Sequence, residues 1–258
     1  MPSPKRKSPP KRSYPRYRRV SKGSRKVRQA PKRSAKKSPR KQSRRPQKVQ
    51  KEIKHSPWRN SDVFSDPIPD QRGFPYKKTR KLASLQKELK VLMAGLNKVC
   101  RRLGLTYCLD SGTLLGAVRH GDIIPWDDDI DVQMTREDIK YMFDNVETIN
   151  EMGFQVRFED SIHRFCKYQP SGKYNLKKDP YIDVFQVKED GNKIIYAHAR
   201  NRERWPRYYF LAKEKYPLKI YQFGRLKVLG PNDPYPYLKR SYGKNWNKGI
   251  VWDTHHEV

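Results

Sequence analysis

The stretch Trp126-Asp127-Asp128-Asp129-Ile130-Asp131 places four carboxylates within five positions. So many like charges repel one another unless a cation or water screens them. Side chains two apart on a strand point to the same face, so we expect Asp129 and Asp131 to lie together, with Ile130 directed into the core. Paired carboxylate oxygens are the ligands that Mg²⁺ or Mn²⁺ prefers. The stretch therefore predicts a metal site at the start of a strand, with an exposed acidic turn as the alternative.

The segment before the acids is typical of a strand, a small-residue turn and a helix start: Leu109-Asp110-Ser111-Gly112-Thr113-Leu114-Leu115-Gly116. Backbone N–H groups at a helix N-terminus lack partners and suit phosphate oxygens. We therefore expect substrate contacts from Ser111, Gly112 and Thr113, and contacts to a diphosphate from Arg119 and His120. An ordinary strand–helix connection and plain surface charge are the alternatives.

A further acid stands alone among apolar residues in Tyr181-Ile182-Asp183-Val184-Phe185, which has the pattern of a strand. An acid in such a position does not serve as core filling. We expect Asp183 to close the site as a third metal ligand or to act as a general base.

The remaining pattern predicts an α+β fold, a mixed sheet with flanking helices. Leucines at three- and four-residue steps predict a long helix from Thr79 that stops at Gly104. Thr135, with Asp138 three residues later, predicts a capped helix start. The predicted strands are 105–109, 129–134, 154–158, 164–168, 181–187 and 193–196, and a hairpin is predicted over 221–229. The other predicted helices are 113–119, 135–153, 201–211 with a bend at Pro206, and 235–242.

The charge of the chain is concentrated at one end. Its net charge is +31, of which residues 1–54 carry +22 in repeats of Lys, Arg, Ser and Pro. This tail has too few apolar residues to offset the entropy of ordering, so we expect it to be disordered and to bind a polyanion such as nucleic acid or anionic lipid. We expect a Pro-rich linker over 55–78, in which Trp58, Val63, Phe64, Ile68 and Phe74 run extended, a folded domain over 79–250 and a short tail over 251–258.

The cysteines and the hydropathy bear on the cellular address. Cys100, Cys108 and Cys166 are odd in number, widely spaced and set in apolar stretches, so we expect buried thiols and an intracellular, reducing compartment. No run of about 18 apolar residues occurs, so no transmembrane segment is expected. The tail leaves the nucleus or an anionic membrane surface open as locations.

These motifs resemble a known family. The stretch Ser111-Gly112-Thr113-Leu114-Leu115-Gly116-Ala117-Val118-Arg119-His120, followed by Ile124-Pro125-Trp126-Asp127-Asp128-Asp129-Ile130-Asp131, is similar to the LicD family, which includes the fukutin and fukutin-related proteins. The segments Phe223-Gly224-Arg225-Leu226-Lys227-Val228 and Tyr242-Gly243-Lys244-Asn245-Trp246 resemble its closing part. The resemblance covers roughly residues 80–246 and implies a polymerase-β-like nucleotidyltransferase fold.

The resemblance also implies an activity and a ligand set. It implies Asp129, Asp131 and Asp183 as catalytic residues and ligands of Mg²⁺ or Mn²⁺, with Asp127 as an additional acid. It implies a transferase that moves a phospho-alcohol, of the phosphocholine or ribitol phosphate type, from a CDP-linked donor to a glycan hydroxyl. Two alternatives stay open: a nucleotidyltransferase acting on RNA, protein or a small molecule, and a catalytically silent nucleic-acid-binding protein.

Overall fold

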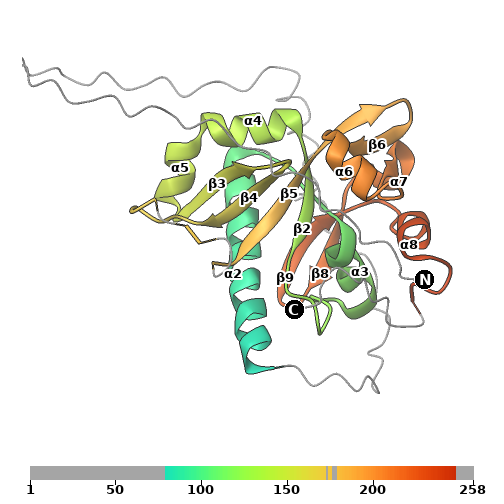
Figure 1. The fold of residues 1–258 in the computed structure, drawn as a ribbon, viewed down its shortest axis with the longest axis horizontal. Coiled ribbons are helices and arrows are strands. Elements are labelled where there is room, and N and C mark those ends of the chain that lie inside the picture. The colour runs from blue at the N-terminus through green and yellow to red at the C-terminus, as the bar shows by residue number, and fades with distance from the viewer. Residues whose placement is uncertain (1–78, 173, 176–178, 248–258) are drawn as a thin grey trace, which may run out of the picture. The chain divides into compact units, whose positions relative to one another are not determined.

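A computed structural model describes residues 79–172, 174–175 and 179–247 (Figure 1). The predicted tail over 1–54, the linker over 55–78 and the tail over 251–258 lie outside these residues. In the described part, no helix is long and apolar enough to cross a membrane. The elements are α2 (Arg80–Leu103), β1 (Cys108–Leu109), α3 (Ser111–His120), β2 (Asp131–Thr135), α4 (Arg136–Asp144), α5 (Val146–Glu151), β3 (Phe154–Glu159), β4 (Ile162–Lys167), β5 (Tyr181–Asp190), β6 (Lys193–Tyr196), α6 (Ala199–Arg204), β7 (Phe210–Leu211), α7 (Ala212–Lys215), β8 (Lys219–Phe223), β9 (Leu226–Gly230) and α8 (Tyr235–Tyr242).

Helix α2 confirms the leucine periodicity. The Thr79 hydroxyl caps its first turn by accepting from the Leu82 N–H at 3.2 Å, and Gly104 ends it with a left-handed φ of 66°. The face that carries Leu89, Leu92 and Leu96 is buried against the sheet. Each such side chain contributes about 2 kcal/mol of apolar burial, so packing rather than helix propensity holds α2 in place.

The sheet confirms the predicted α+β class. Among the described residues, seven strands form one sheet in the order β1-β2-β5-β4-β3, with β6 pairing β5 and β7 pairing β6. Strands β2 and β5 are parallel, and the other pairs are antiparallel. Figure 1 shows α2 crossing behind this sheet, and α2 packs against β4 and β5. The two strands that carry the predicted acids, β2 and β5, are therefore hydrogen-bonded neighbours.

A second, smaller sheet closes the fold beside α3. Strands β8 and β9 form the predicted hairpin around Gly224, whose φ of 59° is one that an L side chain rarely adopts. The Gly224 N–H donates to the carbonyl of Gly121, the residue that ends α3. The hairpin therefore holds the start of the loop that leads from α3 to the acids.

Several predicted elements differ from the structure. The strand predicted over 105–109 is reduced to β1, Cys108–Leu109. Strand β2 begins at Asp131 rather than Asp129. The helix predicted over 135–153 breaks at Asn145, whose backbone leaves the helical region at φ −118° and ψ 27°. The helix predicted over 201–211 ends at Arg204, because the residue before Pro206 is excluded from helical geometry, and the chain then forms β7 against β6.

The thiols of Cys100, Cys108 and Cys166 are free and buried, as predicted. Burial raises the pKa of the Cys108 thiol to about 12, so this side chain stays a neutral packing group at physiological pH.

Candidate functional site

The junction between β1 and α3 is built on a buried carboxylate. Asp110 is fully buried and accepts hydrogen bonds from the hydroxyls of Tyr196 at 2.7 Å and Tyr237 at 2.6 Å. Its backbone N–H donates to the carbonyl of Asp131 at 3.1 Å. A buried charge is tolerated only with such partners. Asp110 therefore fixes the start of α3 against the start of β2.

The first turn of α3 also positions Asp131. The Thr113 hydroxyl is buried and accepts from the Asp131 N–H at 2.8 Å. On the other side of β2, the Asp183 N–H donates to the Ile130 carbonyl at 2.9 Å. This use of the Thr113 hydroxyl fits a positioning role for that residue, and its substrate contact stays a prediction.

The acid loop, residues 121–130 between α3 and β2, is tied to α2 by the amide side chain of Gln86. Gln86 is buried, and its Nε2 donates to the carbonyl of Asp127 at 2.6 Å and to that of Ile124 at 3.0 Å. The Ile124 carbonyl is buried and that of Asp127 is partly buried, so a protein donor replaces much of the water that would otherwise bond to them. Gln86 therefore sets the path of the chain just before the acids.

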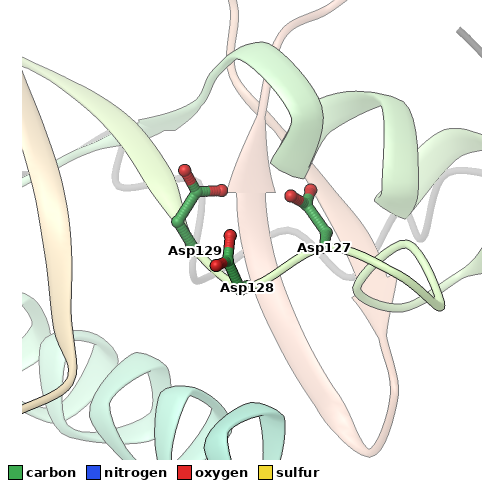
Figure 2. A group of neighbouring side chains, drawn as sticks. All are labelled: Asp127, Asp128 and Asp129. Atoms are coloured by element: carbon green, nitrogen blue, oxygen red, sulfur yellow. The ribbon is translucent and has the colours of Figure 1, made fainter. Parts of the chain in front are cut away.

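The loop gathers three carboxylates. Oxygens of Asp127, Asp128 and Asp129 lie within 4.8 Å of one another. Figure 2 shows the carboxylates of Asp127 and Asp129 on either side of that of Asp128. Asp128 is exposed, whereas the other two are partly buried. A Cβ on Gly112 would lie 2.9 Å from Asp127 Oδ2, so the absence of a side chain there lets this carboxylate approach the N-terminus of α3.

Asp129 connects the loop acids with the strand acids. Burial raises the pKa of the Asp131 carboxyl well above its usual range, and the negative charges of Asp129 and Asp183 raise it further. Burial raises the pKa of the Asp127 carboxyl in the same way, with Asp129 as its strongest charged neighbour. The charge of Asp129 therefore acts on the loop acid Asp127 and on the strand acids Asp131 and Asp183 alike.

Asp183 lies beside Asp131 in the parallel register of β2 and β5. Arg164, its register partner on β4, donates from Nε to Asp183 Oδ1 at 3.1 Å and from a terminal nitrogen to Glu159 at 2.6 Å. Burial raises the pKa of Asp183 to about 6, and the Arg164 guanidinium opposes that rise. Asp183 is therefore mostly ionised at neutral pH and able to accept a proton.

The donor set fits a hard divalent cation. The acids from 127 to 131, together with Asp183, offer carboxylate oxygens, which are the ligands of Mg²⁺ and Mn²⁺. Burial and mutual repulsion raise the pKa values of Asp127 and Asp131, so the metal-free site holds these charges at a cost that a bound cation relieves. The close trio in the loop includes Asp128, which the strand alternation had not selected.

The predicted phosphate-binding residues separate along α3. Ser111, at φ 46°, and Gly112 begin the helix beside Asp127. Arg119 and His120 end the helix, roughly 13 Å along its axis at 1.5 Å per residue. Arg119 is buried, donates to His120 Nε2 at 2.9 Å and to the Trp246 carbonyl at 3.1 Å. These contacts anchor the C-terminal segment and argue against the diphosphate contact, which stays a prediction.

Three residues at the site escaped the sequence analysis. Asp110 was quoted as part of the turn without a role, Gln86 is one polar residue in an apolar helix pattern, and Arg164 was taken as a strand residue. All three are polar side chains at positions where the hydrophobic periodicity of the sequence predicts a buried or strand residue, and this mismatch is the signal that could have identified them. What each one contacts depends on segments distant in sequence.

Comparisons with known proteins agree with the motifs. Residues 104–233 match the family described as LicD/FKTN/FKRP, nucleotidyltransferase domain. An uncharacterised protein of Rickettsia prowazekii is 35% identical over 165 residues, which are 64% of this chain and 57% of that protein. The lipopolysaccharide cholinephosphotransferase LicD of Haemophilus influenzae is 33% identical over 41% of this chain and 44% of its own length. The ribitol-5-phosphate transferase FKTN of Mus musculus is 29% identical over 65% of this chain and 35% of its own length.

A solved structure, that of an antigenic nucleotidyltransferase-like protein from Paracoccidioides brasiliensis, aligns over 56% of this chain and 61% of its own with a TM-score of 0.34 and 14% identity, a likeness too low to carry an argument. The chain spans about half the length of the first curated relatives it matches, at 57% and 48%. The matched family domain covers half of the chain and contains Asp110, the acid loop and Asp183. This chain belongs to the LicD/fukutin/FKRP family, and residues 104–233 are its nucleotidyltransferase domain.

Proposed function

We propose that this protein is a metal-dependent phosphotransferase that moves a phospho-alcohol, of the phosphocholine or ribitol phosphate type, from a CDP-activated donor to a glycan hydroxyl. The observation that carries the proposal is the gathering of the Asp127, Asp128 and Asp129 carboxylates within 4.8 Å at the start of the strand whose Asp131 pairs in register with Asp183. The relatives named as a cholinephosphotransferase and a ribitol-5-phosphate transferase supply the class of group transferred.

The reaction replaces a phosphoanhydride bond of the donor by a phosphodiester bond to the acceptor. The acceptor oxygen attacks the β-phosphorus of the CDP-alcohol, a new O–P bond forms, and the bond to the bridging oxygen breaks, which releases CMP. A divalent cation such as Mg²⁺ or Mn²⁺ would supply positive charge that offsets the charge developing on the donor diphosphate. Asp129, Asp131 and Asp183 would hold it, with Asp127 as an additional ligand. Asp127 and Asp129 belong to the close trio in the loop, and Asp131 and Asp183 are register partners.

The chain's own groups orient the reactants. The Asp183 carboxylate takes the acceptor hydroxyl proton through the oxygen that it does not give to the cation, and Arg164 keeps this carboxylate in place. The N-terminus of α3 beside Asp127 contributes its positive dipole end to the donor phosphates. Ser111 and Gly112 belong to this end of the helix, whereas Asp110, Thr113 and Gln86 hold the frame.

The direct assay measures which product leaves. The protein is incubated with Mg²⁺ or Mn²⁺ and either a panel of CDP-alcohols or the nucleoside triphosphates. Release of CMP from a CDP-alcohol is the expected result. Release of pyrophosphate would instead favour a nucleotidyltransferase, and release of neither would leave a catalytically silent protein.

Single Asp→Asn variants separate the ligand sets. We expect Asp129→Asn and Asp131→Asn to abolish turnover while the metal-free protein unfolds at an unchanged or higher temperature, because each variant removes one carboxyl group from a cluster of mutually repelling acids. Asp128→Asn is the matched comparison, since Asp128 is exposed and its loss should leave most turnover. Near-normal turnover in Asp129→Asn would sink the proposed site, and a loss in Asp128→Asn would move the metal into the loop trio.

A further inference from the structure

A cavity opens next to Asp183. Its volume is about 560 Å³, which is in the range of small-molecule sites. Its walls come from the turn between β3 and β4, residues 159–162, from Arg164 on β4, and from α6 with the adjoining Trp205. Nothing in the site described so far uses this space except Arg164.

The cavity lies on the same face of the sheet as the acids. Asp131, Asp183 and Arg164 are register partners across β2, β5 and β4, and side chains opposite one another on neighbouring strands share a face. Arg164 joins the two regions directly, with Nε on Asp183 at 3.1 Å and a terminal nitrogen on Glu159 at 2.6 Å. A molecule in the cavity is therefore in reach of the proposed base.

The walls are built before any ligand arrives. The Ser161 hydroxyl donates to Asn201 Oδ1 at 2.8 Å, and Asn201 Nδ2 returns a bond to the Ser161 carbonyl at 3.0 Å. Both residues are buried, so the β3–β4 turn is tied to α6. Trp205 packs edge-on against Phe185, with 5.7 Å between ring centroids. These contacts preorganise the cavity.

The wall chemistry selects among ligand classes. Glu159 pairs with Arg164, Asp160 pairs with Arg200 at 3.7 Å, and Arg204 lies over the Trp205 ring at 4.8 Å. Three guanidiniums and two carboxylates line the cavity, and the carboxylates neutralise two of the guanidiniums, so a phosphate, which only accepts hydrogen bonds, would meet both repelling and attracting groups. A sugar hydroxyl both donates and accepts, and the C–H surface of a sugar ring matches an indole among polar groups. Alternating carboxylates and guanidiniums beside one aromatic ring therefore suit a saccharide.

We propose that this cavity is the acceptor subsite, in which a neutral saccharide unit binds between the β3–β4 turn and α6 and presents a hydroxyl toward Asp183. The inference rests on the proposed transferase function and adds to it the residues that hold the acceptor. The donor nucleotide then binds on the other side of the acids, toward α3.

The test is direct binding by saturation-transfer NMR on the full chain. The probes are the methyl glycosides of glucose, galactose, N-acetylglucosamine and N-acetylgalactosamine, with CMP as the donor-side probe. We expect at least one glycoside to bind, and the exposed pair Arg200→Ala/Arg204→Ala to weaken it by about tenfold while CMP affinity stays within about twofold. Arg207→Ala is the control, because Arg207 is exposed on the same segment and does not line the cavity.

Each result has a fixed meaning. Equal glycoside affinity in the wild type and the double variant would overturn the proposal, as would the failure of every glycoside to bind. Loss of CMP affinity in the double variant would reassign the cavity to the donor. CMP release from the panel of CDP-alcohols, measured with the bound glycoside as acceptor, tests the transferase function separately. A wild type that binds a glycoside in this cavity but releases no CMP from any donor contradicts the function and leaves the cavity standing as a saccharide site.

Discussion

Replacing Gln86 by Met tests how the acid loop is held. Met has a similar length but donates no hydrogen bond, so the Asp127 carbonyl loses the donor that lies 2.6 Å away. The Ile124 carbonyl keeps the Asp127 N–H at 3.0 Å as a second donor, and its loss is therefore smaller. The Pro125 carbonyl, 3.4 Å from the same nitrogen, also loses a donor, so the expected penalty is that of the partly buried Asp127 acceptor left unpaired plus a smaller share from Pro125.

The magnitude follows from that count. An unsatisfied buried polar group costs about 1–3 kcal/mol, and 1 kcal/mol shifts the melting temperature of a domain this size by about 2–4 °C. We expect the free energy of unfolding to fall by about 1–3 kcal/mol in urea titrations, and CMP release to fall at least about tenfold because the loop no longer holds Asp127 and Asp129 in one arrangement.

The control is Lys87→Met on the same helix, because Lys87 is exposed and both variants introduce the same residue, Met. This variant should unfold within about 0.5 kcal/mol of the wild type and keep full turnover. If Gln86→Met matches Lys87→Met in both stability and turnover, the amide does not position the loop, and the reasoning from its hydrogen bonds is wrong.

Two further predictions use other parts of the structure. Gly112→Ala puts a Cβ 2.9 Å from Asp127 Oδ2, so we expect turnover to fall. The free energy of unfolding should stay equal or rise by up to about 1 kcal/mol, because Ala favours a helix over Gly. Retained turnover in this variant would show that the position of the Asp127 carboxylate is not needed. Burial, with a further contribution from the neighbouring His198 ring, lowers the pKa of His163 to about 4, so between pH 6.5 and 4 the unfolded chain binds this proton more readily and stability falls with falling pH. Urea unfolding of the wild type should lose about 2 kcal/mol from this histidine between pH 7 and pH 5, a share absent from His163→Leu, and equal pH slopes for both proteins would refute it.

Local patterns determined much of the fold. The caps of α2 at Thr79 and Gly104, the Thr135 cap of α4 and the hairpin at Gly224 are set by residues within a few positions of one another, and the structure confirms them. The helix predicted beyond Pro206 was wrong because pairing of β7 with β6 competes with helix propensity there. That competition involves partners distant in sequence, which periodicity does not register.

For the site, the sequence by itself determined which residue types are present: a run of acids next to a small-residue turn, and one more acid in a later strand. The tertiary structure alone decided their neighbours. The parallel register of β2 and β5 sets Asp183 beside Asp131, α2 brings Gln86 to the loop, and β4 brings Arg164 to Asp183. The physical reason is the distance along the chain over which each interaction acts. Side-chain periodicity and helix capping involve residues a few positions apart in sequence. Charge, burial and side-chain hydrogen bonding involve any residues that the packed sheet brings together in space.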